Sequence, residues 1–422
     1  MSEATQITTL KNGLRVASET LPHVETAALG VWVNAGGRNE AAHINGAAHM
    51  LEHMAFKGTS SRSALDIALE IENVGGQLNA YTGREQTAYY ARTLKHDWPL
   101  ALDILADILQ HSSFEAHELE RERQVILQEI GQVNDTPDDL IFDRFQEIAY
   151  PDQACGRSIL GTPDIVAGMQ SDDLKAFMRQ HYDPATMVVS AAGNVDHAAL
   201  VDLCERSFAD LQSHERPELA PSRYVPQSWI DERDFDQLHV ILGVDGLSFR
   251  DDDFYALQTL SMILGGGMSS RLFQEVREQR GLAYSVFSFA SSMSDGGLFG
   301  IYAGTGAEQT EELLTVIGQE LKKLTHTIDA TELERARNQI QASLMMGLES
   351  CSAVCEDMAR QLLCFDRRLT NAEVIARFDA VTIDQLHNIA ARLLTDAKPA
   401  VAAIGPWPDN LAKADFVGLL AT

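Results

Sequence analysis

Gly58-Thr59-Ser60-Ser61-Arg62 opens a helical pattern in the first half of the chain, and Gly267-Met268-Ser269-Ser270-Arg271 opens a similar pattern in the second half. Three further matches follow in the same order: Leu29–Val31 with Leu242–Val244, Glu118–Arg121 with Glu332–Arg335, and Asp173–Gly193 with Asp384–Gly405. All offsets are about 210 positions, which is the size of one domain. The shared order and the nearly constant spacing predict a tandem duplication.

The joint between the two copies is expected in a polar segment that contains Pro217, Pro221 and Pro226, as extended linkers often do. This places domains at residues 1–213 and 233–422, with a linker at residues 214–232. Strand-like runs are expected at 27–33, 187–192, 238–242 and 400–404, and amphipathic helices at 63–74 and 100–110. Strands and helices do not alternate strictly, so the pattern predicts an α+β fold of two homologous α/β domains.

The net charge of the chain excludes some classes of binding partner. The 422 residues carry 33 Lys and Arg against 61 Asp and Glu, a net charge of −28. Such a chain repels nucleic acid and anionic lipid and attracts basic ligands. The acidic groups either line an internal chamber or cover the outer surface, and both interpretations remain open.

Other features of the composition indicate the compartment. No apolar run approaches the length of a membrane span, and the N-terminal residues resemble neither a secretory signal nor an organelle presequence. Five cysteines in 422 residues do not form a disulfide framework. We therefore expect a cytoplasmic protein with no membrane and no nucleic acid among its partners.

A metal-binding pattern lies in the stretch Asn45–Phe56, where His49, Glu52 and His53 form His-x-x-Glu-His. In a helix, positions i, i+3 and i+4 share a face, so both imidazoles can reach one divalent ion. The carboxylate between them can take a proton from a water molecule that the metal activates. These are the residue types that zinc-dependent hydrolysis requires.

A third ligand is expected from the helical segment 118–130, where Glu122 and Glu129 lie seven positions apart and share one face. From spacing alone, either glutamate can serve. The duplication provides an internal control, because the second copy replaces all five polar candidates. The replacing residues are Gln258, Ser261, Met262, Ala336 and Ser343. Residues that merely cover a helix surface are not expected to diverge together, so we predict one metal site per chain.

At these residues the sequence resembles the M16 zinc metallopeptidases, an inverzincin family, and most closely its short subunits such as the mitochondrial processing peptidase β-subunit and bacterial homologues. The resemblance implies a LuxS/MPP-like metallohydrolase fold with one Zn²⁺ per chain. It implies His49, His53 and Glu129 as zinc ligands and Glu52 as the general base. It also implies that Glu122 orients one of the ligands.

The resemblance extends to substrate binding. The stretch Gly75–Thr82 is similar to the family's edge strand, on which a peptide adds as an extra β-strand through residues such as Asn79 and Ala80. Arg277 and Tyr284 match the family's Arg-x6-Tyr pair, which clamps the substrate from the C-terminal domain. In short subunits this pair comes from a partner chain. Because this chain carries both the zinc motif and the Arg/Tyr pair, the resemblance implies a clamshell homodimer with two composite sites.

The predicted function is therefore a zinc-dependent endopeptidase that cleaves extended peptides or unfolded oligopeptides inside a dimeric chamber. Glu52 would activate the attacking water, and Tyr284 would stabilise the oxyanion. One alternative is a catalytic β-type subunit that needs a different, α-type partner in a heterodimer. Another is a non-catalytic scaffold, although a scaffold has no reason to retain every ligand and Glu52.

Overall fold

A computed structural model of the chain describes residues 5–408 and divides it into two compact units. Residues 1–4 and 409–422 of the two predicted domains lie outside the described residues. Among the described residues, the first unit comprises residues 5–131, 157–220 and 345–369, and the second comprises residues 132–156, 221–344 and 370–408. No helix within residues 5–408 is long and apolar enough to cross a bilayer.

The first unit is built on a mixed sheet that, within the described residues, has six strands in the order β1-β2-β6-β3-β5-β4. Its strands are β1 (Gln6–Thr9), β2 (Arg15–Thr20), β3 (Thr26–Val33), β4 (Gln77–Thr82), β5 (Thr87–Leu94) and β6 (Met187–Gly193). Its helices are α1 (Ala47–Ala55), α2 (Ala64–Asn73), α3 (Trp98–His111), α4 (Ala116–Asp135), α6 (Pro163–Gly168), α7 (Ser171–His181), α8 (His197–Ser207) and α12 (Cys351–Phe365). Strand β4 lies at an edge, which leaves one side of its backbone without a neighbouring strand.

The second unit has a mixed sheet of five strands, among the described residues, in the order β7-β11-β8-β10-β9. The strands are β7 (Ser228–Glu232), β8 (Leu238–Asp245), β9 (Ala283–Ser292), β10 (Gly297–Thr305) and β11 (Ala400–Gly405). The helices are α5 (Pro137–Ala149), α9 (Phe254–Gly265), α10 (Thr310–Leu324), α11 (Ala330–Gly347), α13 (Asn371–Asp379) and α14 (Ile383–Leu394). Strand β9 is the edge strand that corresponds to β4.

The two sheets repeat one topology, as expected if the chain arose by duplication. In each, a parallel pair (β2 with β6, β7 with β11) is followed by antiparallel pairings out to the edge strand. The first sheet adds β1 on its outer side. The prediction of an α+β chain with two domains, each built on a mixed sheet, is therefore confirmed.

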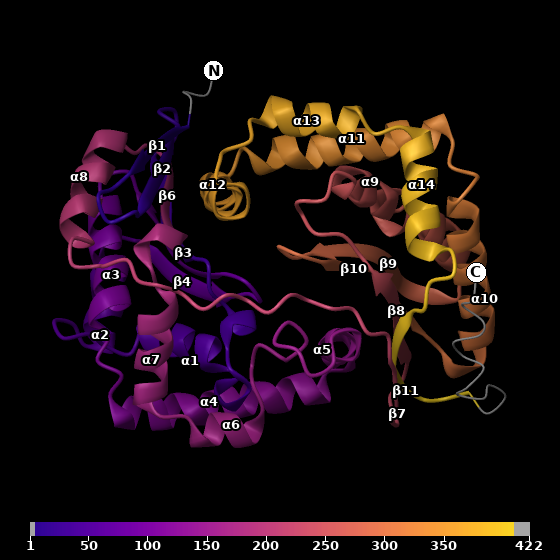
Figure 1. Ribbon diagram of the computed structural model, residues 1–422, viewed down its shortest axis with the longest axis horizontal. Helices are drawn as coiled ribbons and strands as arrows, with labels where there is room; N and C mark the ends of the chain where they lie inside the picture. Colours follow the sequence, from indigo (N-terminus) through magenta and orange to yellow (C-terminus); the bar gives the residue numbers. More distant parts are fainter. Residues whose placement is uncertain (1–4, 409–422) are drawn as a thin grey trace. The chain divides into compact units, whose positions relative to one another are not determined.

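The central strand β3 shows why the first sheet is buried on both faces. Ala27, Leu29, Val31 and Val33 point into a core shared with α1, α3 and α8. Ala28 and Trp32, at alternating positions, pack against α12 on the other face. Side chains that alternate between two apolar environments make a continuously apolar strand, as expected for a sheet covered on both sides. Figure 1 shows α3 and α8 on one side of this sheet and α12 on the other.

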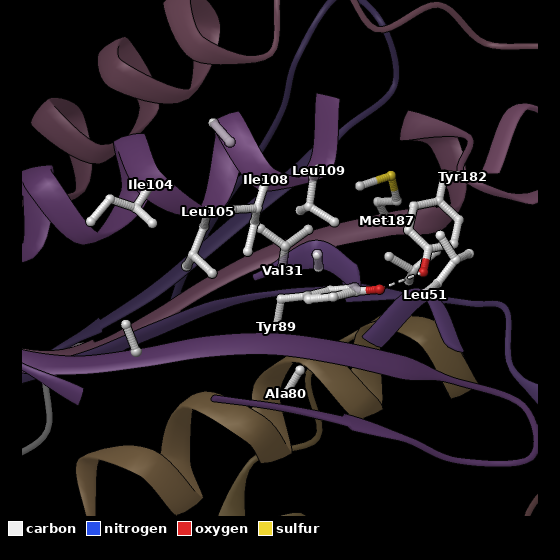
Figure 2. Packing of buried hydrophobic residues seen from close by; sticks show 14 of the residues in the cluster. Val31, Leu51, Ala80, Tyr89, Ile104, Leu105, Ile108, Leu109, Tyr182 and Met187 are labelled. Carbon is white, nitrogen blue, oxygen red and sulfur yellow. Dashed lines mark hydrogen bonds between the residues drawn. The ribbon is translucent and has the colours of Figure 1, made fainter. Parts of the chain in front are cut away.

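The core beneath the first sheet also contains a polar contact. Tyr89 of β5 and Tyr182 lie with their hydroxyl oxygens 2.9 Å apart, as the dashed line in Figure 2 shows. Val31, Leu51, Leu105 and other apolar side chains surround this pair. Each buried hydroxyl therefore has a hydrogen-bond partner, which removes the free-energy cost of an unpaired polar group.

The two compact units do not coincide with the two domains expected from the sequence, because each unit contains a helix from the other half of the chain. Helix α5, from the first half, packs against β7, β8 and β11 of the second unit, and α12, from the second half, packs against β2, β3 and β6 of the first. The last five residues of the predicted linker form β7. The boundaries at residues 1–213, 214–232 and 233–422 thus remain a proposal about the duplicated sequence and do not describe the compact units.

Candidate metal centre

The two histidines lie on α1 as the spacing predicts. Met50, Leu51 and Met54 on one side of this helix are buried in the first core. His49 and His53 emerge together on another side, with ring centroids 4.7 Å apart. The apolar residues fix the rotation of the helix, and that rotation keeps the imidazoles out of the core.

Helix α4 supplies the two glutamates. Glu122 is 6% exposed, whereas the side chain of Glu129 is 38% exposed. The Nε2 atoms of His49 and His53 each lie 3.6 Å from Oε2 of Glu129. One ligand atom from each of these three residues falls within 4.8 Å of the other two.

This donor set fits zinc. Two donors bound at about 2.0–2.1 Å to one tetrahedral ion lie roughly 3.3 Å apart, so separations of 3.6 Å require only a small adjustment. Two imidazole nitrogens and one carboxylate oxygen also match the open three-ligand sites of zinc hydrolases. Among the described residues, this is the single group of three such side chains that could hold a metal ion.

Glu122 contacts the Nδ1 atom of His53, and the candidate metal ligand of that ring is the other nitrogen, Nε2. Its Oε2 lies 3.0 Å from Nδ1 of His53, and its Oε1 accepts a 2.6 Å contact from Nζ of Lys57. With the proton on Nδ1 donated to Glu122, the Nε2 lone pair of His53 points toward His49 and Glu129. Burial raises the pKa of Glu122, but the hydrogen bonds from Lys57 and His53 outweigh it and hold the pKa below its ordinary value.

The charge state of His49 also suits a ligand. Burial, helped by the neighbouring charge of His53, lowers the pKa of His49 from 6.5 to about 4. The imidazole is therefore neutral at pH 7, and neutral imidazole is the form that binds a metal ion.

Glu52 lies on α1 between the two candidate ligand histidines and is held by strand β4. Oγ1 of Thr82 donates a 2.7 Å hydrogen bond to Oε2 of Glu52. Burial raises the pKa of Glu52, although the hydrogen bond from Thr82 partly opposes this effect. A carboxylate with a raised pKa is a better proton acceptor near neutral pH.

The structure places the predicted peptide-binding residues on edge strand β4. Ala80 is buried in the core and is 7% exposed, so its side chain faces away from solvent. The side chain of Asn79 is exposed, and its Oδ1 accepts a 2.8 Å hydrogen bond from the backbone N–H of Ala80. Of this pair, only Asn79 therefore offers an accessible side chain.

Arg277 and Tyr284 are brought together in the second unit. The Arg277 guanidinium carbon lies 4.7 Å from the ring centroid of Phe273 and 4.3 Å from that of Tyr284. Arg277 also donates a 3.1 Å hydrogen bond to the backbone oxygen of Tyr284. Tyr284 is 73% exposed at the start of edge strand β9, so its hydroxyl is open to a ligand.

Sequence reasoning missed the roles of Thr82, Lys57 and Glu40. Lys57 lies four positions after His53, a helical spacing that could have indicated its contact with Glu122. Thr82 follows Ala80 by two positions and therefore shares its face of β4. Glu40 accepts 2.8 Å hydrogen bonds at the N-terminal end of α1, from the side chain of Asn45 and from two backbone N–H groups. No periodic pattern in the sequence indicates this role of Glu40.

Comparisons with known proteins agree with this geometry. The family model "Insulinase (Peptidase family M16)" matches residues 15–163, and "Peptidase M16 inactive domain" matches residues 168–340. An uncharacterized zinc protease of Streptomyces coelicolor is 42% identical over 96% of this chain and 90% of its own length. The chain belongs to peptidase family M16.

Other M16 relatives support the same conclusion. The mitochondrial-processing peptidase subunit beta of Lentinula edodes is 38% identical over 95% of this chain and 90% of its own length. The crystal structure of a protease from Helicobacter pylori superimposes with a TM-score of 0.88 at 26% identity, covering 96% of this chain and all of that one. Together with the histidine and glutamate cluster, M16 membership confirms the prediction of an enzyme of the zinc metallopeptidase class.

Proposed function

We propose that the chain is a zinc-dependent endopeptidase that cleaves extended peptides. The observation that carries this proposal is the convergence of His49, His53 and Glu129, beside a Glu52 carboxylate that Thr82 holds in place. Zinc bound there would supply Lewis acidity, which polarises the scissile carbonyl and makes a water molecule easier to deprotonate.

The chain's own groups would do the proton transfer and the positioning. Glu52 would take a proton from the attacking water and later deliver it to the leaving amine. Glu122 and Lys57 would hold His53 in one tautomer and orientation. The buried side of α1 would keep both histidines in place during the reaction.

Substrate would bind along β4, because this strand ends the first sheet and no strand pairs with its outer side among the described residues. A peptide that adds there as an extra strand lies extended and passes Thr82, and therefore Glu52. Asn79 and Ala80 would contribute mainly through the backbone of the strand. This mode of binding selects for extended or unfolded chains.

We further propose that a second copy of the chain supplies Arg277 and Tyr284 to the site in a homodimer. The hydroxyl of Tyr284 is exposed, and the stacking of Arg277 between two rings preorganises the pair. Such a donor pair can hold a peptide carbonyl and stabilise the developing oxyanion. The alternative is a heterodimer with a related subunit, which the similarity to relatives named as β-subunits supports.

The deciding experiment measures metal content and cleavage of a mixed peptide library, with and without chelator. The proposal expects about one zinc per chain and cleavage that the chelator abolishes and zinc restores. Glu52→Gln should retain zinc and lose cleavage by roughly 10²–10⁴-fold. Zinc without cleavage, in a protein that light scattering shows to be a homodimer, would contradict the homodimeric enzyme and favour a missing partner.

A further inference from the structure

A groove of about 800 Å³ lies in the first unit, between helix α12 and the part of the sheet formed by β3, β4 and β5. Trp32, Asn79, Tyr81, Arg92 and Glu356 are among the residues that line it. The histidines and glutamates of the metal centre do not line this groove. It is therefore a separate concavity beside the same edge strand.

Successive side chains of β4 point alternately toward the metal centre and toward the groove. Ala80 and Thr82 face the side of α1, where Ala80 joins the core and Thr82 contacts Glu52. Asn79 and Tyr81, at the alternate positions, face the groove, and Tyr81 packs against α12. The side chains of an added strand follow the alternation of the strand it pairs with. A peptide on β4 would thus direct every second side chain toward the groove.

The wall of the groove holds a fixed carboxylate. Nε1 of Trp32 donates a 3.3 Å hydrogen bond to the hydroxyl of Tyr81, and that hydroxyl donates a 3.0 Å hydrogen bond to Oε1 of Glu356. Within residues 5–408, no lysine, arginine or histidine forms an ion pair with Glu356. A partly buried carboxylate that has no cationic partner and lies beside aromatic rings is a suitable site for a cation.

Two basic residues near the groove bear on its selectivity. Arg92 lines the groove, and its guanidinium donates to the side-chain oxygen of Gln77. Arg360 is close enough to act electrostatically on Tyr81, but it is exposed. Neither forms an ion pair with Glu356 in the described chain, so the carboxylate remains available to a ligand.

We propose that this groove is a specificity pocket, in which Glu356 pairs with a lysine or arginine side chain of the bound peptide. The pocket acts on the two substrate residues that lie opposite Asn79 and Tyr81, which are two positions apart. This inference rests on the proposed peptidase function and on substrate addition to β4. It assigns the preference to one carboxylate and does not invoke the overall negative charge of the chain.

The test compares kcat/KM for peptides that carry lysine or glutamine at one position and are otherwise identical, with the position moved residue by residue. The zinc-loaded full chain should prefer lysine roughly fivefold at positions two residues apart and show no preference at the position between them. Glu356→Gln should reduce this ratio to about one. The substituted amide still accepts the hydrogen bond from Tyr81, so an unchanged melting temperature is expected. Glu72→Gln, the same change at an exposed site on α2, should leave the ratio unaltered.

The possible results separate this inference from the proposed function. Cleavage with an equal lysine preference at all positions, unaffected by Glu356→Gln, would refute the pocket and leave the peptidase intact. Cleavage with no lysine preference would do the same. If the zinc-loaded wild-type chain cleaves no peptide, the proposed function fails, and the pocket fails with it.

Discussion

Thr82 of the edge strand β4 and Glu52 of helix α1 are joined by a 2.7 Å hydrogen bond from Oγ1 to Oε2. The strand proposed to bind substrate and the carboxylate proposed to move the proton therefore contact each other directly. The same hydroxyl lies 3.3 Å from the backbone oxygen of Ala48 on α1. A displacement of β4 would be transmitted to the base through one side chain.

Thr82→Val tests this contact. The hydrogen bond from Thr82 lowers the pKa of Glu52, so its loss should raise that pKa further. Because the base acts in its ionised form, the acid limb of the kcat/KM profile should move to higher pH, and activity at pH 7 should fall about tenfold. Thr9→Val, on the exposed outer strand β1, is the matched control. An acid limb that stays in place would show that Thr82 does not tune Glu52.

Glu122→Gln should weaken zinc binding without removing a ligand. The amide can no longer accept two charge-assisted hydrogen bonds from His53 and Lys57, so the orientation of His53 is less well fixed. A loss of about 10–100-fold in zinc affinity is expected, measured by competition with a chromogenic chelator. Lys57→Met should have a smaller effect, because Glu122 keeps its contact with His53. Equal losses in both variants would indicate that charge, and not the orientation of His53, sets the affinity.

The titration of His49 in the metal-free chain is a third prediction. Since burial lowers its pKa from 6.5 to about 4, the ring should stay neutral through the physiological range. The folded chain binds fewer protons at this site than the unfolded chain, so the contribution of His49 to stability is lost as pH falls from 6.5 toward 4. Nitrogen chemical shifts of the imidazole, followed against pH, give the midpoint directly. A midpoint near 6.5 would contradict the buried environment of the ring.

The His-x-x-Glu-His part of the candidate metal centre could be predicted from the sequence because its signal is local. His49, Glu52 and His53 lie within two turns of one helix, so periodicity alone places them on a common face. The choice between Glu122 and Glu129 could not be made from spacing. It depends on the separation of each carboxylate from the imidazoles, and only the fold sets that separation.

The packing partners of α5 and α12 could not be predicted from the sequence. An apolar face on α5 or α12 predicts that each helix packs against something, but it carries no information about which sheet. Met358 and Ala359 of α12 belong to the same buried apolar cluster as Ala28 and Val188 of the first sheet, so the cluster joins segments far apart in the chain. The bounds expected from the duplicated sequence, residues 1–213 and 233–422, carry no information that α5 packs in the second unit and α12 in the first.

Glu40 provides the last prediction. Its carboxylate is 3% exposed and accepts hydrogen bonds from the side chain of Asn45 and from the backbone N–H groups of Gly46 and Ala48, at the start of α1. Burial raises its pKa from 4.5 to about 7, although these hydrogen bonds and the charge of Arg157 oppose the shift. A carboxyl group whose pKa is raised on folding contributes stability that is complete below pH 4.5 and is lost as pH rises through 7.

Glu40→Gln removes this titration while keeping the shape of the side chain. In urea unfolding of the metal-free chain, the stability of the wild type relative to the variant should fall by about 3 kcal/mol between pH 4.5 and 7.5. Glu120→Gln, at an exposed position on α4, controls for the change in net charge. A difference that rises with pH would mean that the hydrogen bonds at the start of α1 outweigh burial, so that Glu40 holds α1 as an ionised cap.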